Sequence, residues 1–364
     1  MQASFPTRSI LAAAILVSLA APTARAADVF QITNRTSDLD PTAFAAVIEQ
    51  FNTLADNLES EVNTLLSTDA RTSLASGFAS ANAGVTTALA GDHANSPSLL
   101  SVGAGLQGSV FVGADGFAMA GSNELPEIGV GLQTAVTVGF TPSLFGLQKL
   151  GPIDGKRLSI YLSGLSFTQS LQGFDLNMAN FGVKGQYQIV APRGASFLLK
   201  WEGVSFGTGV LYSSNSASYG ANVAFEQSGA TETLSVDLDY NLGISSSVTT
   251  IPLELSTAGK LLGLITVFGG VGADLSFGGS TLIGGAEGPI SASSTAPGVG
   301  SLEAFSGNAV LDLETDDGFV AAPFLQSRVF FGTQFDLWVL KLGIEAVLNG
   351  TGSYGGAANL RVVL

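Results

Sequence analysis

The last stretch of the chain, Thr351 to Leu364, has the sequence TGSYGGAANLRVVL. Successive side chains of an extended strand point to opposite faces, so every second residue shares a face. The first face is largely apolar and the second largely polar: Tyr354, Gly356, Ala358, Leu360, Val362 and Leu364 lie opposite Ser353, Asn359, Arg361 and Val363. If the apolar face meets lipid, both strand edges need partners, because hydrocarbon offers no water to unpaired backbone groups. A closed antiparallel β-barrel meets both requirements.

The composition also favours one large barrel over two ordinary soluble domains. Only 12% of the residues are charged, about half the share that is usual in soluble domains, and 46 of the 364 residues are glycine. No run of 18 apolar residues follows the first 26 positions. The apolar residues instead recur largely at every second position, which is the pattern of barrel strands that face lipid.

The first 26 residues predict a removable export signal. Arg8 supplies the positive charge, Ile10 to Ala21 the apolar run, and Ala24-Arg25-Ala26 the cleavage pattern. The run of 12 residues is well short of the roughly 20 that a membrane-spanning helix requires. We therefore expect cleavage before Ala27 and export to the bacterial cell outer membrane.

The charge balance disfavours nucleic acid as a partner. Residues 1–26 contain Arg8 and Arg25 but no acidic residue, so 12 Lys and Arg would remain against 29 Asp and Glu, a net charge of −17. Counterion release from nucleic acid requires clustered Lys and Arg. The chain has no cysteine, which excludes disulfides and thiolate metal sites.

Residues 27–98 are expected to form a helical segment that plugs the barrel lumen or caps its periplasmic mouth. Asp40 and Pro41 predict a helix start, with the aspartate as cap and the proline at the first helical position. A weaker helical pattern runs from Asp69 to Leu89. A helical hairpin or oligomerisation stalk outside the barrel is the alternative. Apolar residues recur at intervals of mostly three and four residues, which gives the first helix one apolar stripe. We interpret this stripe as the packing face of the plug helix, and its members are Phe44, Val47, Ile48, Phe51, Leu54 and Leu58.

From residue 99 to residue 364 the apolar period changes from 3.6 to 2. Clear alternation covers 100–112, 128–140, 233–242 and 353–364. Bacterial single-chain barrels close with an even number of strands. We therefore predict an all-β transmembrane fold, an antiparallel β-barrel of about 14 strands with 12 as the fallback, preceded by the helical segment.

Two stretches depart from simple alternation. Leu261 to Phe268 is apolar on both faces and predicts either a buried strand or a short helix. The alternation also changes parity near Asp336 and Leu337, which indicates a turn or a bulge.

Two motifs are given structural interpretations. Gly103-Ala-Gly105-Leu-Gln-Gly108 matches the dinucleotide fingerprint as a string, but the strand alternation continues through it. Glycines within a strand favour close packing or curvature, so no nucleotide cofactor is expected. His93 is the one histidine and lies in the polar stretch 91–97, which predicts a solvated hinge residue.

Carboxylates provide the candidate functional side chains. Asp237 and Asp239 share the polar face of one predicted strand, and Asp312 and Glu314 share that of another, with neighbours about 7 Å apart. A Ca²⁺ site needs roughly six to eight oxygens from a preorganised loop, which no local run clearly supplies. Glycosidases also use paired carboxylates, but nothing indicates a substrate cleft. We interpret these residues as lumen-facing or solvated, and we expect no catalytic residue, cofactor or metal.

With the signal, the helical leader and the alternating strands, the chain resembles bacterial outer-membrane β-barrel proteins. Leu360, Val362 and Leu364 resemble the C-terminal strand signal, although that signal usually ends on an aromatic residue. The resemblance implies the barrel assembly machinery and outer-membrane lipid as partners. A helical segment before about 14 strands is also loosely similar to long-chain fatty-acid transporter barrels and to spirochaete surface-adhesin barrels.

These features predict an outer-membrane channel or transporter, for small or hydrophobic solutes, whose leader helices occlude the lumen. The alternative is a structural or adhesive surface barrel with no permeation pathway. An enzyme is not expected. The sequence identifies no solute.

The two faces of the terminal strand give a direct test of the barrel. Val362→Asp should impair assembly more than Arg361→Asp, because a charge on the lipid face is destabilising whereas one on the lumen face is tolerated. The measurement is the fraction of protein that migrates as a folded, heat-modifiable band. Equal tolerance of the two substitutions would count against the barrel.

Overall fold

The computed structural model describes residues 29–85, 91–95, 98–113, 127–194, 198–228, 232–294, 303–313 and 319–364. The predicted export signal and Glu314 lie outside these residues. The helices are α2 (Ala45–Leu65), α3 (Thr68–Val85) and the 3₁₀ turn η2 (Pro142–Phe145). The strands are β1 (Phe30–Thr36), β2 (Leu100–Val112), β3 (Ile128–Phe140), β4 (Lys149–Leu150), β5 (Ile153–Asp154), β6 (Leu158–Leu171), β7 (Phe174–Val190), β8 (Leu199–Ser228), β9 (Glu232–Leu261), β10 (Ile265–Ser294), β11 (Glu303–Asp312), β12 (Val320–Ala321), β13 (Leu325–Leu337), β14 (Leu340–Asn349) and β15 (Ser353–Val363).

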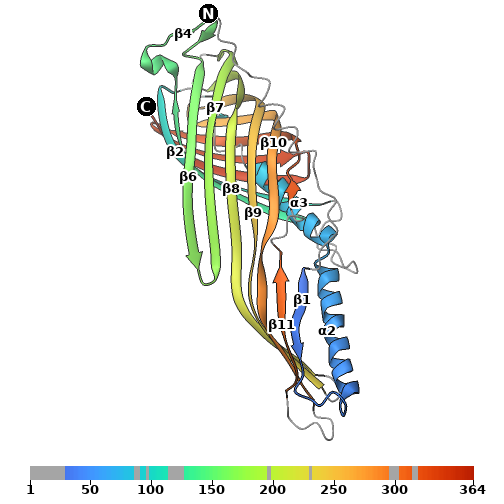
Figure 1. The fold of residues 1–364 in the computed structure, drawn as a ribbon. Helices are drawn as coiled ribbons and strands as arrows, with labels where there is room; N and C mark the ends of the chain where they lie inside the picture. The colour runs from blue at the N-terminus through green and yellow to red at the C-terminus, as the bar shows by residue number, and fades with distance from the viewer. Residues whose placement is uncertain are drawn as a thin grey trace, which may run out of the picture.

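Ten antiparallel strands close into a barrel, which we call the ring. Their order is β2-β3-β6-β7-β8-β9-β10-β13-β14-β15, and β15 pairs back with β2 (Figure 1). In this closing pair, Val362 lies opposite Val102 and Tyr354 lies opposite Val110. The terminal strand thus has a partner on each edge, and the predicted antiparallel barrel preceded by helices is confirmed.

The ring turns its apolar face outward. On β2, Val102, Leu106 and Val110 are exposed, whereas Gln107 and Ser109 are buried in the interior. The terminal strand behaves in the same way, because Val362 is exposed and Arg361 points inward to Asp92. A polar interior inside an apolar outer wall is the arrangement of barrels in lipid.

The strand count differs from the predicted 14. The described sheet contains 13 strands, of which ten form the ring. The main reason is that β8, β9 and β10 are each 30 residues long. The alternation at 233–242 and at 251–255, for example, belongs to the single strand β9. Periodicity alone does not mark where a strand leaves the ring.

The two irregular stretches are both hairpin turns. β9 ends at Leu261 and β10 begins at Ile265, and Leu262 and Gly263 between them have φ of 51° and 65°. The prediction of a buried strand or a helix was wrong for residues 262–264, where apolar residues occupy the turn itself, whereas Ile265 to Phe268 belong to strand β10. The parity change near Leu337 is a turn at Trp338 and Val339 between β13 and β14, as one of the two interpretations expected.

Beyond the ring, β8, β9 and β10 continue and are joined by β11 and β1 to form a projecting sheet, which we call the arm. Helix α2 covers one face of this sheet (Figure 1). Phe51 is buried in the shared core and stacks on Phe305 with ring centroids 6.2 Å apart. The arm thus has its own hydrophobic core, outside the ring.

The start of α2 is four residues later than predicted. The Asp40 carboxylate accepts hydrogen bonds from the backbone N–H groups of Thr42 and Ala43, and these bonds hold its pKa below the ordinary value. They stabilise a turn that precedes the helix, whose first residue is Ala45. Asp40 therefore caps this turn rather than the helix.

Side chains of α2 also occupy the outer edge of β1. Asn63 exchanges hydrogen bonds with the backbone N–H and C=O of Phe30, and Glu59 accepts one from the N–H of Ile32. An edge strand with free backbone groups is a template for pairing with other chains. These contacts satisfy the edge and fix β1 to the arm. Among the described residues, no helix combines the length and the apolarity needed to cross a membrane.

Candidate functional site: the occluded lumen

Helix α3 lies inside the ring, directly against β3. A Cβ added at Gly129 would overlap the backbone of Gly77, and one added at Gly131 would overlap the backbone of Ala81. Glycine in a strand allows another backbone to approach closely. Gly129 and Gly131 on the inward face of β3 therefore let the helix backbone contact the wall of the ring directly.

Polar side chains of the wall hold the helix on its other sides. Ser109 donates a hydrogen bond of 2.5 Å to the Ala81 carbonyl, and Gln107 donates one of 3.3 Å to the Gly84 carbonyl. Asn82 donates to Ser246 at 2.9 Å. Buried polar groups of a barrel interior need such partners. Helix α3 provides them with backbone carbonyls and a side-chain amide.

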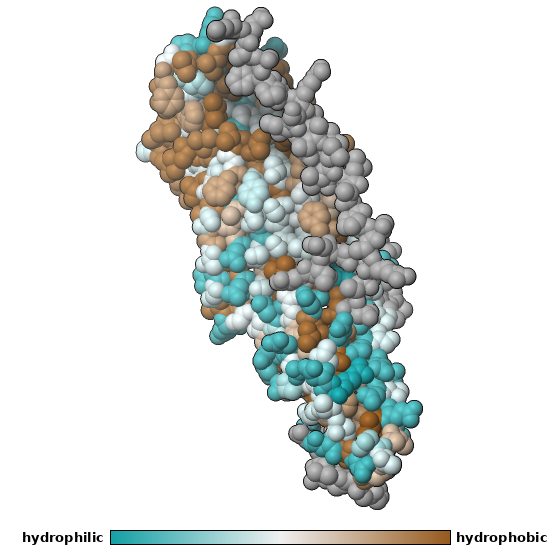
Figure 2. All heavy atoms as spheres, in the orientation of Figure 1, coloured by the Kyte–Doolittle hydropathy of each residue, from teal (hydrophilic) through white to brown (hydrophobic). Residues whose placement is uncertain are grey.

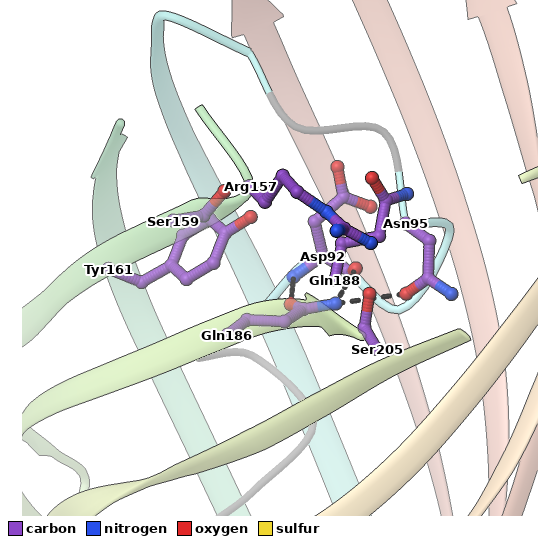
Figure 3. A pocket seen from close by; sticks show the side chains of 8 residues that line it. All are labelled: Asp92, Asn95, Arg157, Ser159, Tyr161, Gln186, Gln188 and Ser205. Atoms are coloured by element: carbon purple, nitrogen blue, oxygen red, sulfur yellow. Dashed lines mark hydrogen bonds between the residues drawn. The ribbon is translucent and has the colours of Figure 1, made fainter. Parts of the chain in front are cut away.

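Residues 91–95 continue this filling of the lumen. Gln186 donates hydrogen bonds to the Asp92 carbonyl at 2.8 Å and to Asn95 Oδ1 at 2.9 Å (Figure 3). Ser256 donates a hydrogen bond to the same Asn95 oxygen. We call α3 together with residues 91–95 the plug. A polar pocket of about 10 Å³ adjoins the plug and has room for about one water. The residues that line it are Asp92, Asn95, Arg157, Ser159, Tyr161, Gln186, Gln188 and Ser205.

A group of charged side chains joins the plug to the ring. His93 Nδ1 lies 2.6 Å from Glu345 Oε2, and His93 Nε2 lies 3.2 Å from Glu254 Oε1. Both ring nitrogens thus face a carboxylate, and the Lys184 ammonium also lies 3.2 Å from His93 Nε2. Lys184 and Arg328 each form an ion pair with Glu254.

Arg328 also forms an ion pair with Asp274 at 2.9 Å. We call these six side chains the lumen cluster: His93, Lys184, Glu254, Asp274, Arg328 and Glu345. All six are buried, at 4% exposure or less. Buried charges are tolerated when each has an opposite partner, whereas removal of one partner is strongly destabilising. The cluster therefore ties strands β7, β9, β10, β13 and β14 to a single histidine of the plug.

The expectation for His93 was wrong. The sequence predicted a solvated hinge histidine, but the side chain is 2% exposed and lies 4.4 Å from the Phe330 ring centroid. Its flanking residues are polar in either case, because a barrel lumen is as polar as a surface loop. A signal for burial existed in the partners, since Lys184, Glu254 and Glu345 stand among alternating apolar residues of predicted strands.

The acidic candidates lie on the arm rather than within the ring. Asp237, Asp239 and Asp312 are exposed on the sheet face opposite α2, and Asn222 donates hydrogen bonds to both Asp237 and Asp239. Glu314 lies outside the described residues. Asp239, Asp312 and Glu287 line an open groove of about 530 Å³. In the part of the chain that the structure describes, no three His, Asp or Glu side chains are grouped to hold a metal ion.

The stripe expected for a plug helix is on α2 and packs on the arm. Its members contact the core around Phe305 and Ile290: Phe44, Val47, Ile48, Phe51, Leu54 and Leu58. The helix in the lumen is instead α3, which is rich in alanine and glycine. The residues of the C-terminal strand signal, Leu360, Val362 and Leu364, are all exposed on the outer side of the ring.

A family model described as Lsa36-like matches residues 27–364, almost the whole chain. The chain belongs to the Lsa36-like family. The match begins at Ala27, the residue that the predicted cleavage would leave first. A search of curated proteins finds no match.

Solved outer-membrane barrels are among the structures similar to this Lsa36-like chain. The translocator domain of the autotransporter NalP from Neisseria meningitidis is 14% identical, with 74% of this chain and 89% of that chain covered and a TM-score of 0.28. The outer-membrane protein Omp33 of Acinetobacter baumannii is 9% identical, with 73% and 98% covered and a TM-score of 0.22. A FadL homologue of Pseudomonas aeruginosa is 8% identical, with 79% and 97% covered and a TM-score of 0.23. The ring of the Lsa36-like chain is established by its own strand pairings.

The lumen cluster gives a stability prediction. Arg328→Met should lower the free energy of unfolding by about 3–5 kcal/mol, because Asp274 and Glu254 would lose their buried guanidinium partner. Arg35→Met is the matched control, because its carboxylate partners Asp56 and Glu59 are 64% and 26% exposed and stay solvated, so the loss should be at most about 1 kcal/mol. Urea unfolding of the detergent-solubilised protein measures both. Similar losses in the two variants would contradict a structural role for the cluster.

Proposed function

We propose that this chain is an outer-membrane surface barrel, in which the ring anchors the protein, the plug closes the lumen and the arm is displayed outside the cell. The ring has the exposed apolar outer wall and the polar interior that lipid requires. In Figure 2, hydrophobic residues gather at the end of the molecule that holds the ring, and hydrophilic residues predominate along the arm. This distribution supports a ring in lipid and an arm in water.

The observation that carries the proposal is the path of residues 30–100. β1 pairs with β11 on the arm, α2 packs on the same sheet, α3 and residues 91–95 lie in the lumen, and β2 begins at the opposite end of the ring. The plug is therefore held at both ends. To leave the lumen, it would have to break the β1–β11 pairing and the arm core as well as the lumen cluster.

The extension of β8, β9 and β10 beyond the ring at the arm end supports an orientation, although β6–β7 and β14–β15 also turn within two or three residues at that end. At the end of the ring away from the arm, β9 joins β10 through residues 262–264, and β13 joins β14 through residues 338–339. We call this the short-turn end. Outer-membrane barrels have short periplasmic turns and longer extracellular segments. The short-turn end would then face the periplasm and the arm would face outward.

Cysteine labelling tests the orientation. The chain has no native cysteine, so any label on the protein reports the introduced cysteine alone. Asp237→Cys on the arm should react with a membrane-impermeant maleimide on intact cells. Lys156→Cys, also exposed but at the short-turn end, should react only after the outer membrane is permeabilised. The two reagent-accessible positions serve as controls for each other.

Labelling of Lys156→Cys on intact cells with Asp237→Cys protected would reverse the orientation and overturn the proposal of a displayed arm. Labelling of both positions before permeabilisation would overturn the location in the outer membrane. Folded protein in both variants is verified by heat-modifiable migration, so a misassembled variant is recognised.

A plugged channel is the second candidate function. The observation that favours a channel is the polar wall of the lumen. If the plug were displaced, this wall would suit water and a small hydrophilic solute. Its buried polar side chains include Gln107, Ser109, Gln133, Lys184, Ser246 and Gln326. Such a lining does not suit a hydrophobic solute. In addition, α3 contacts β3 where Gly129 and Gly131 let the two backbones approach closely. A helix seated in this way has less to hold it against sliding than one with a ridge of leucines.

Planar-bilayer recordings separate the two candidates. The surface-barrel proposal predicts no steady conductance from the full chain. In the combined variant Gly129→Leu and Gly131→Leu, the new side chains would displace α3, and a channel should then conduct. Gly108→Leu is the matched control, because residue 108 is on the outward face of the neighbouring strand. Steady conductance from the full chain would reject the surface barrel, whereas silence in all three proteins would reject the channel.

A further inference from the structure

The short-turn end of the ring exposes a large apolar side chain at every described strand connection. These side chains are Phe145 between β3 and β6, Leu198 between β7 and β8, Leu262 and Leu264 between β9 and β10, and Trp338 between β13 and β14. Trp338 is 99% exposed. Turns in water normally carry glycine, proline and small polar residues. We call this set the apolar tip.

Backbone geometry makes two of these residues more unusual. Leu262 and Trp338 have φ of 51° and 57°, in the left-handed region that favours glycine and asparagine. At the other end of the ring, left-handed turn positions are occupied by polar Gln172 and by Gly173 between β6 and β7, and by Gly352 between β14 and β15. The hairpins at the tip therefore place bulky apolar side chains where turn geometry favours small residues. Neither the backbone nor contact with water explains this choice.

The longest connection at this end adds positive charge to the apolar surface. Residues 142–156, which we call the paddle, contain η2, β4 and β5 and expose Leu144, Phe145, Leu147, Leu150 and Ile153. Lys149 and Lys156 are exposed on the same segment. Apolar side chains flanked by lysine are typical of segments that lie in a membrane interface, with the ammonium groups near anionic headgroups.

The apolar tip is continuous with the apolar outer wall of the ring. On β13, the exposed residues run from Leu325 through Phe331 to Leu337, which is adjacent to Trp338. Twelve residue steps span about 40 Å along a strand, or about 28 Å across a membrane at a tilt of about 45°. This is close to the hydrocarbon thickness of about 30 Å. The boundary of the hydrocarbon would therefore coincide with the turns of the tip.

We propose that the apolar tip is itself embedded in phospholipid, with the turn side chains in the acyl region and the paddle lysines at the headgroups. This inference rests on the proposed function, since it requires the ring to lie in a membrane. It places the short-turn end within the inner leaflet instead of in water. The part of the protein outside the membrane then lies entirely on the side of the arm, and the arm stands clear of the membrane.

Tryptophan fluorescence tests the proposal, because the chain has only Trp201 and Trp338. Trp201→Phe leaves Trp338 as the single reporter. The protein is reconstituted in vesicles of phosphatidylcholine and phosphatidylglycerol in which the acyl chains carry bromine at a shallow or a deep position. Trp338 should lose emission in brominated vesicles, with the greater loss for the shallow bromine. Phe145→Trp in a background without the native tryptophans should behave in the same way.

Two reporters in the background Trp201→Phe and Trp338→Phe separate the possible failures. Phe331→Trp reports the outer wall of the ring, and Asp239→Trp reports the arm. Loss of emission for Phe331→Trp but not for Trp338 would overturn the embedded tip and leave the ring in the membrane. No loss for Phe331→Trp would overturn the proposed function itself. A Trp338 emission that is blue-shifted but not quenched would overturn lipid as the occupant and indicate a protein contact such as a second copy.

Discussion

The pairing of β15 with β2 is the interaction on which the rest of the structure depends. A strand whose outer face is apolar cannot leave backbone groups unpaired in hydrocarbon, so an open sheet of these strands would have two unacceptable edges. The closing pair removes both edges through a continuous register from Ser353 opposite Phe111 to Val363 opposite Ser101. Closure of the ring also creates an enclosed interior. The need to fill this interior is a second consequence of the requirement that backbone groups be paired in hydrocarbon.

An interior of ten strands has to be filled by groups that satisfy the inward side chains. The outward face is apolar, so alternation leaves polar and charged residues on the inside. The plug satisfies these inward side chains in two ways, by hydrogen bonds and by ion pairs. Helix α3 offers carbonyls and an asparagine to Ser109, Gln107 and Ser246, and His93 completes the ion pairs between β9 and β14. Each buried charge in the cluster then has an opposite partner, which is the condition for tolerating it.

Sequence predicted those features that alternation alone decides. β2, β3 and β15 were predicted within a residue or two, because each is short, half-apolar and confined to the ring. The arm was not predicted, because Val236 and Leu238 alternate in the same way whether they face lipid or the stripe of α2. For the same reason the sequence left Asp237 and Asp239 as either lumen-facing or solvated. Their polar face lies in water in either case, and only the pairing of β11 with β10 and of β1 with β11 shows that the sheet has left the ring.

The position of His93 was missed for a different physical reason. A short polar segment between a helix and a strand predicts a surface hinge, and the polarity of a lumen is indistinguishable from that of solvent in one sequence. Burial becomes apparent only when Lys184, Glu254 and Glu345, which are far apart in the chain, are brought to one point. Single-sequence reasoning supplies the charged residues but not their convergence.

The path of the plug constrains the order in which the barrel forms. β1 pairs with β11, and α2 packs on the arm, so the first described residues lie on the far side of the ring from the start of β2. Threading this segment through a ring that had already closed would carry a helix and a strand through a narrow, charged interior, and native chains avoid such threading. Enclosure is the simpler route, because β15 is the last strand in the chain and its pairing with β2 is the step that completes the ring. The closing pair therefore determines both the lipid-facing surface and the moment at which the plug is trapped inside it.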